Sequence, residues 1–64
     1  MNVNGKVSEL NVPITVKELI AGLGYREDRV AVELNGNIIP RSDYENVYLC
    51  SNDSVEIVGF VGGG

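Results

Sequence analysis

The sequence predicts an α+β domain in which one main helix packs on one face of a mixed sheet of about five strands. Residues 16–23 carry apolar side chains at helical spacing, whereas residues 30–34 and 55–60 alternate as half-buried strands do. Asn-Gly pairs at 4–5 and 35–36 are strong signals for tight hairpins. Because the chain has 64 residues, we expect one domain with a small core.

The N-terminal segment predicts a hairpin. Residues 1–4 form a short strand with Met1 and Val3 on one face, and Asn4-Gly5 forms the turn. A return strand is expected from about residue 6 to residue 10. It ends before Pro13, which has no amide hydrogen to donate to a neighbouring strand.

The main helix is expected to begin after Thr15. Thr15 and Glu18 form a capping-box pattern, in which each side chain accepts a hydrogen bond from the other residue's amide. Gly24 suits the left-handed residue that follows a helix, with Tyr25 packing back on Ile20. One apolar stripe, expected to lie in the core, recurs at i, i+3, i+4 and i+7: Val16, Leu19, Ile20 and Leu23.

The second half predicts short strands joined by turns. A strand over 30–34 turns at 35–37 into a brief arm at 38–39; a single helical turn follows over 42–45, a short apolar segment over 47–50 and a turn over 51–54. The last strand, 55–60, places Val55, Ile57 and Gly59 on one face and Glu56, Val58 and Phe60 on the other. The helix has to cover one face of the sheet, and a right-handed crossover lets the first and last strands pair in parallel at its centre. This arrangement is the β-grasp, or ubiquitin-like, fold.

Residues 1–60 are therefore predicted to form the β-grasp domain and residues 61–64 a flexible glycine tail. Gly62, Gly63 and Gly64 have no side chains, so such a thread fits a channel too narrow for other sequences. Its reach is about 13–14 Å when extended. The expected functional group is the Gly64 carboxylate, which is ionised at neutral pH. We interpret it as a substrate for another enzyme; the alternative is ordinary terminal fraying.

Composition narrows the class of function. The net charge of −4 argues against a nucleic-acid partner, because phosphate binding requires clustered Lys and Arg. No apolar run approaches the roughly 20 residues of a membrane span, and no signal peptide is visible. A single cysteine fits a reducing cytoplasm, and the absence of His removes the commonest general base and metal ligand. We expect a cytoplasmic protein that binds no cofactor or metal itself and is not an enzyme.

Three further groups of side chains are candidates for a functional role. Cys50 lies in an apolar segment with no Lys, Arg or His close in sequence, so we interpret it as a core or half-buried residue. The acidic residues at 43, 45 and 53 lack the spacing of a calcium loop and are interpreted as solvated charge. Val58, Phe60 and Val61 adjoin the tail and form a candidate docking patch, although isolated exposed apolar residues are common.

A family resemblance extends over essentially the whole chain. It rests on residues 4–5, 15–16, 18–19, 29–36, 39–41, 55–58 and 60–64, of which the strand ending in Asn35-Gly36, the pair Pro40-Arg41 and the glycine tail are together fairly specific. On these residues the chain resembles the ThiS sulfur carriers of thiamine biosynthesis. The related small subunits of molybdopterin synthase differ around 29–41. Two positions depart from the family pattern: Gly59, where Arg or another larger residue is common, and Ser54, where Asp is usual.

The resemblance implies a mechanism in which partner enzymes act on Gly64. An E1-like adenylyltransferase of the ThiF type uses ATP and Mg²⁺ to adenylate the Gly64 carboxylate. A persulfide donor then converts the acyl-adenylate to a thiocarboxylate, whose sulfur passes to a thiazole synthase of the ThiG type. Adenylation is needed because a carboxylate is a poor electrophile and its mixed anhydride with AMP is a good one.

Two other functions stay open. One is a related carrier for molybdopterin, tRNA thiolation or protein conjugation. The other is a non-covalent ubiquitin-like binding module whose tail is chemically inert. The chemical use of the Gly64 carboxylate separates the second alternative from the carriers.

Overall fold

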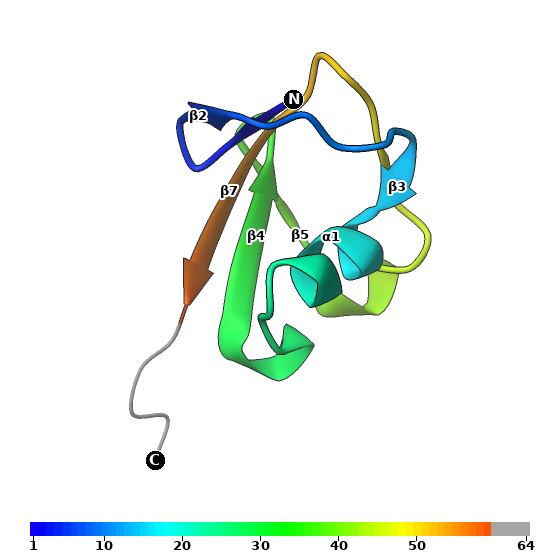
Figure 1. Cartoon of the computed structure of the whole chain (residues 1–64). Helices are drawn as coiled ribbons and strands as arrows, with labels where there is room; N and C mark the ends of the chain where they lie inside the picture. Colours follow the sequence, from blue (N-terminus) through cyan, green and yellow to red (C-terminus); the bar gives the residue numbers. More distant parts are fainter. Residues whose placement is uncertain (60–64) are drawn as a thin grey trace.

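A computed structural model describes residues 1–59 of the chain and contains a five-stranded main sheet, a two-stranded pair and one α-helix (Figure 1). The order of the main sheet is β2-β1-β7-β4-β5, and β3 pairs with β6. The elements are β1 (Asn2–Val3), β2 (Lys6–Val7), β3 (Ile14–Thr15), α1 (Val16–Gly22), the 3-10 helix η1 (Glu27–Arg29), β4 (Val30–Leu34), β5 (Asn37–Ile39), the 3-10 helix η2 (Arg41–Asp43), β6 (Tyr48–Leu49) and β7 (Ser54–Gly59).

Strands β1 and β7, the first and last in the chain, are parallel neighbours at the centre of the main sheet, as predicted. Asn2 pairs with Ser54 and Val3 with Val55. On its other side β7 pairs antiparallel with β4, over a register that begins at Val30↔Gly59. The mixed sheet with one helix against one of its faces confirms the predicted β-grasp fold.

Local sequence signals set both ends of α1. The Thr15 hydroxyl accepts a hydrogen bond from the Glu18 amide at 3.0 Å, and the Glu18 carboxylate accepts one from the Thr15 amide at 2.8 Å. This reciprocal pair is the predicted capping box. At the other end Gly24 has φ +84°, the Gly24 amide donates to the Ala21 carbonyl, and the Tyr25 amide donates to the Ile20 carbonyl. The helix therefore ends in the predicted Schellman motif.

The core lies between α1 and the inner face of the sheet. Its side chains come from the helix, from both long strands and from the segment between β5 and β7, and nine apolar residues are buried: Val16, Leu19, Ile20, Val30, Val32, Tyr44, Leu49, Val55 and Ile57. Burial of this set is the main favourable term in folding. The predicted inner faces of the strands at 30–34 and 55–60 are confirmed for these residues.

Three sequence expectations differ from the structure. The return strand β2 covers Lys6–Val7 rather than residues 6–10, because its partner β1 has only two residues. The short helical turn begins at Arg41, directly after Pro40. Leu23, expected on the apolar stripe, is 47% exposed because α1 ends at Gly22 and Leu23 becomes its C-cap residue.

The capping box yields a stability prediction. We expect Thr15→Ala to lower the free energy of unfolding by about 1 kcal/mol, because the Glu18 amide loses its acceptor at the helix start. Thr15→Ser keeps the hydroxyl and serves as the control. Urea unfolding of the three proteins measures the difference, and equal stability of the Ala and Ser variants would contradict the role of the cap.

Candidate functional site

The candidate site is the end of β7, the strand that leads into the glycine tail. Its last pair with β4 is Val30↔Gly59. The predicted site residues Phe60, Val61, Gly62, Gly63 and Gly64 lie outside the described residues. Strand β7 precedes them in the chain, and its hydrogen bonds over Ser54–Gly59 show how it is anchored.

Asn4 anchors the middle of β7. The Ile57 amide donates to the Asn4 side-chain oxygen at 2.6 Å, and the Asn4 amide donates to the Val55 carbonyl at 2.8 Å. Because β1 ends at Val3, the Asn4 side chain continues the hydrogen bonding of the parallel pair one step beyond the strand. Asn4 also has φ +51°, which the hairpin turn requires and which Asn tolerates better than most residues.

Asn35 anchors the start of β7 in the same manner. Its side-chain oxygen accepts from the Ser54 amide at 2.9 Å, and its side-chain nitrogen donates to the Asp53 carboxylate at 3.0 Å. The other Asp53 oxygen accepts from the Cys50 amide at 2.8 Å. The hydrogen bond from the Asn35 side chain lowers the pKa of Asp53 most, and the hydrogen bond from the Cys50 amide lowers it further, because both stabilise the ionised carboxylate.

The sequence identified both Asn residues as turn formers but missed these side-chain roles. An asparagine amide can donate and accept at once, which a glycine or alanine in the same turn could not do. This ability of asparagine predicts an anchoring contact only when the strand that lies beside the turn is known. The two Asn-Gly turns therefore both shape the hairpins and hold the strand that carries the tail.

The described end of β7 is open on both faces. Val58 faces outward and is 56% exposed, as predicted; its role in docking remains a prediction. A Cβ placed on Gly59 would meet no atom within 4 Å, so the described residues leave space for a side chain to begin at this position. Ser54 is exposed, and its hydrogen bonds with Asn35 use only backbone groups: the Ser54 amide donates to the Asn35 side-chain oxygen, and the Ser54 carbonyl accepts from the Asn35 amide at 2.8 Å.

The interpretation of Cys50 as a core or half-buried residue is wrong, because its side chain is exposed. In β6 it is Leu49 that faces the core, with no exposed surface. Cys50 then leaves the strand, and its amide turns toward Asp53. An apolar neighbourhood in sequence did not reveal that the chain turns outward at this residue.

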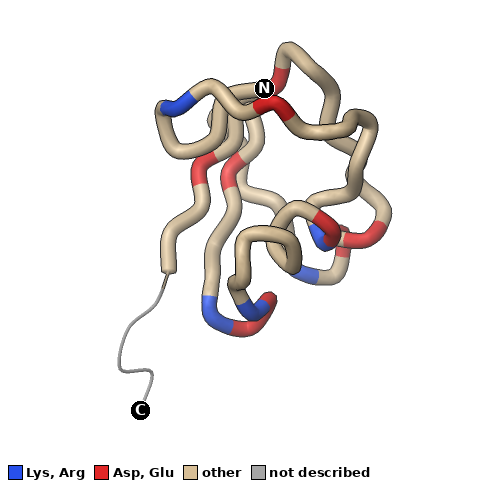
Figure 2. Tube along the Cα trace, in the orientation of Figure 1, with Lys and Arg blue, Asp and Glu red and all other residues tan. Residues whose placement is uncertain are grey.

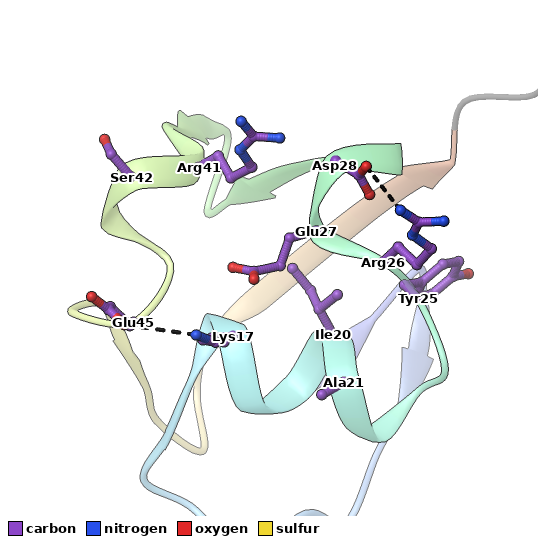
Figure 3. Close-up of a pocket in the computed structure, with 10 residues that line it drawn as sticks. All are labelled: Lys17, Ile20, Ala21, Tyr25, Arg26, Glu27, Asp28, Arg41, Ser42 and Glu45. Atoms are coloured by element: carbon purple, nitrogen blue, oxygen red, sulfur yellow. Dashed lines mark hydrogen bonds and ion pairs between the residues drawn. The ribbon is translucent and has the colours of Figure 1, made fainter. Parts of the chain in front are cut away.

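A shallow hollow lies on the helix side of the molecule, between α1, η1 and η2 (Figure 3). Its rim holds two ion pairs, Lys17–Glu45 at 3.8 Å and Arg26–Asp28 at 3.2 Å. Burial raises the pKa of the nearby Tyr44 hydroxyl, and the positive charge of Arg41 opposes this rise. Cations and carboxylates are mixed here, so the hollow favours neither a cationic nor an anionic ligand.

Within residues 1–59, no three or more His, Cys, Asp or Glu side chains are grouped so that they could hold a metal ion. In the same range, no helix is long and apolar enough to cross a membrane.

Comparisons with known proteins give a consistent family match. The model of the ThiS family matches residues 1–64. The crystal structure of the thiamine biosynthesis protein ThiS from Geobacter metallireducens has a TM-score of 0.82 and 35% identity, covering 98% of this chain and 96% of that one. The sulfur carrier protein ThiS of Bacillus subtilis is 44% identical over 50 residues, which cover 78% of this chain and 76% of the relative.

Larger proteins also contain a similar segment. The thiazole synthase of Paramagnetospirillum magneticum is 40% identical over 62 residues, 97% of this chain but 19% of that protein. The thiazole synthase of Magnetococcus marinus is 36% identical over 64 residues, 100% of this chain and 20% of that protein. The chain thus spans about one fifth of the length of these two relatives.

The Asn4 contact predicts a local change in hydrogen exchange. We expect Asn4→Gly to keep the turn and to speed exchange of the Ile57 amide about tenfold, the size expected from losing one hydrogen bond. Asn4→Asp retains an acceptor and is the control. Exchange measured by NMR at Ile57 and at neighbouring β7 amides tests this, and unchanged protection at Ile57 would contradict the anchor.

The Asp53 contact predicts a pH dependence of stability. Since the pKa of Asp53 is lowered in the folded state, its contribution is present above the unfolded-state value of about 3.9 and is lost as pH falls through the lower folded value. We expect Asp53→Asn to be less stable than the original chain at pH 7, and the difference to disappear at a pH below the folded-state pKa of Asp53. Urea unfolding across this range tests the convergence, and a gap independent of pH would contradict it. When Asn35→Gly is also present, the loss of stability caused by Asp53→Asn at pH 7 should be smaller, because the Asn35 side chain no longer donates to Asp53.

Proposed function

The chain belongs to the ThiS family, and on this premise we propose that it is a sulfur carrier of thiamine biosynthesis rather than an enzyme. The observation that carries the proposal is the family match over residues 1–64, which includes the glycine tail. The small sulfur carrier from Bacillus subtilis and the ThiS structure from Geobacter metallireducens support the same role. The single cysteine agrees with the expected cytoplasmic location.

In the proposed reaction the reactive group is the Gly64 carboxylate. A carboxylate oxygen attacks the α-phosphorus of ATP, held with Mg²⁺ by a ThiF-type adenylyltransferase, and pyrophosphate leaves. The terminal sulfur of a persulfide donor then attacks the carbonyl carbon, and AMP leaves. A thiol attacks the resulting acyl disulfide, so that the products are the Gly64 thiocarboxylate and a disulfide. The carrier supplies an acyl terminus, while ATP and metal belong to the partner.

A thiazole synthase of the ThiG type is the proposed acceptor of the sulfur. Support comes from the two thiazole synthases that contain a segment similar to this whole chain. A segment joined to a synthase is held at high effective concentration relative to it, which favours transfer between the two. The separate chain would have to dock instead, and Val58, Phe60 and Val61 are the residues we propose for contact beside the tail.

The tail gives a direct test of the carrier function. We expect Gly63→Ala, and separately a chain extended by one residue after Gly64, to slow adenylation by about a hundredfold, since a misplacement of about 1 Å at a reacting group has this effect. The added methyl restricts φ and ψ, and the extension moves the carboxylate by about 3.3–3.6 Å. Pyrophosphate exchange with the adenylyltransferase of the same organism measures the rate, and thermal melting checks the fold.

The matched control is Cys50→Ser, which changes the exposed thiol away from the tail. This variant should still form the thiocarboxylate, detected by mass spectrometry of the intact chain. Loss of sulfur loading in a folded Cys50→Ser protein would assign the sulfur to Cys50 instead. Failure of the original chain to undergo adenylation would favour the non-covalent binding module.

A further inference from the structure

Two carboxylates oppose each other on the outer face of the main sheet. Glu33 of β4 and Glu56 of β7 are direct cross-strand partners. Side chains in such a pair have Cβ atoms about 4.5–5.5 Å apart. In Figure 2 an acidic segment, coloured red, lies on each of the two neighbouring strands β4 and β7. Their sequence neighbours Val32, Val55 and Ile57 face the core, so this acidic pair faces away from it.

The acidic pair has no cation within the part of the chain that the structure describes. The two ion pairs found there, Lys17–Glu45 and Arg26–Asp28, involve other carboxylates. Glu33 is nevertheless half-buried, with a paired strand on each side. Like charges directly opposite each other destabilise a sheet. Within residues 1–59 the fold therefore carries an electrostatic cost at this position that no ion pair offsets.

Exposed apolar side chains flank the acidic pair on the same face. Ile38 of β5 is the cross-strand partner of Glu33 on its other side and is 65% exposed. Val58 follows Glu56 by two residues, lies opposite the half-buried Ala31, and is 56% exposed. The outer face thus combines an acidic centre with apolar margins, which is a composition suited to a protein surface with one central cation.

We propose that this face docks the adenylating enzyme, with an arginine of that enzyme seated between Glu33 and Glu56 and with its apolar surface covering Ile38 and Val58. A guanidinium group has five donors in a planar fork and can therefore bond both carboxylates at once. The choice of an arginine rests on charge complementarity. A cation would stabilise the two opposed carboxylates, and no ion pair within residues 1–59 involves either of them. Contact along β7 also holds the strand that leads directly into the tail. This inference rests on the proposed function.

The test compares two double variants of equal net charge. Glu33→Gln with Glu56→Gln removes the acidic pair, and Glu9→Gln with Glu45→Gln removes two carboxylates outside the main sheet. Pyrophosphate exchange with the adenylyltransferase of the same organism gives kcat and KM for each carrier. We expect KM to rise about tenfold or more for the sheet variant with kcat unchanged, because docking is weakened while the tail is intact. The control variant should keep a KM close to that of the original chain.

Salt and thermal melting give two independent measurements. Added salt should raise KM of the original chain more steeply than that of the sheet variant, since screening acts on the charge contact. Glu56→Gln alone should raise the Tm of the isolated carrier by about 1–5 °C through relief of the like-charge contact. A residue that served only the fold would lower the Tm when changed.

The outcomes separate this inference from the proposed function. Exchange with the original chain and an unchanged KM for the sheet variant would overturn the docking face alone. Equal rises in KM for both double variants would assign the effect to net charge and overturn it as well. A lower Tm for Glu56→Gln would show that the acidic pair is already compensated and remove the argument for a cation. No exchange with the original chain would overturn the proposed function, and this inference with it.

Discussion

Strand β7 is paired on both sides, and this pairing holds the main sheet together. The sheet order β2-β1-β7-β4-β5 consists of two hairpins, and β7 is the strand that joins them. Its parallel contact with β1 requires a crossover, and the crossover contains α1. Val55 and Ile57 then place the inner side of β7 against the core that the helix closes. Loss of β7 would separate the hairpins and expose this core.

The same pairing explains how a small domain can present a tail for chemistry. The strand before the tail is held by β4 as far as Gly59 and by the Asn4 side chain at Ile57. Hydrogen bonds from the side chains of Asn4 and Asn35, one in each Asn-Gly turn, therefore hold the strand that precedes the tail. In the proposed reaction the partner enzyme supplies the activating groups and this chain supplies the position of the reacting group.

The two faces of the sheet serve different purposes. The inner face is apolar and stabilises the fold, whereas the outer face holds opposed carboxylates between exposed Ile38 and Val58. A sheet selected for stability alone would place opposite charges or polar pairs across neighbouring strands. The arrangement on the outer face is therefore better understood through a partner than through the isolated chain.

The features that rest on local contacts could be predicted from the amino-acid sequence alone. The capping box at Thr15, the Schellman ending at Gly24, the Asn-Gly turns and the alternating faces of β4 and β7 all depend on residues a few positions apart, whose geometry is limited by backbone sterics and short-range hydrogen bonds. Three features could be found only in the folded chain: Cys50 is exposed, the Asn4 side chain accepts a hydrogen bond from a residue 53 positions away, and Glu33 lies opposite Glu56. These features depend on strand register and on where a loop leaves the core, and both are set by packing between segments distant in the chain.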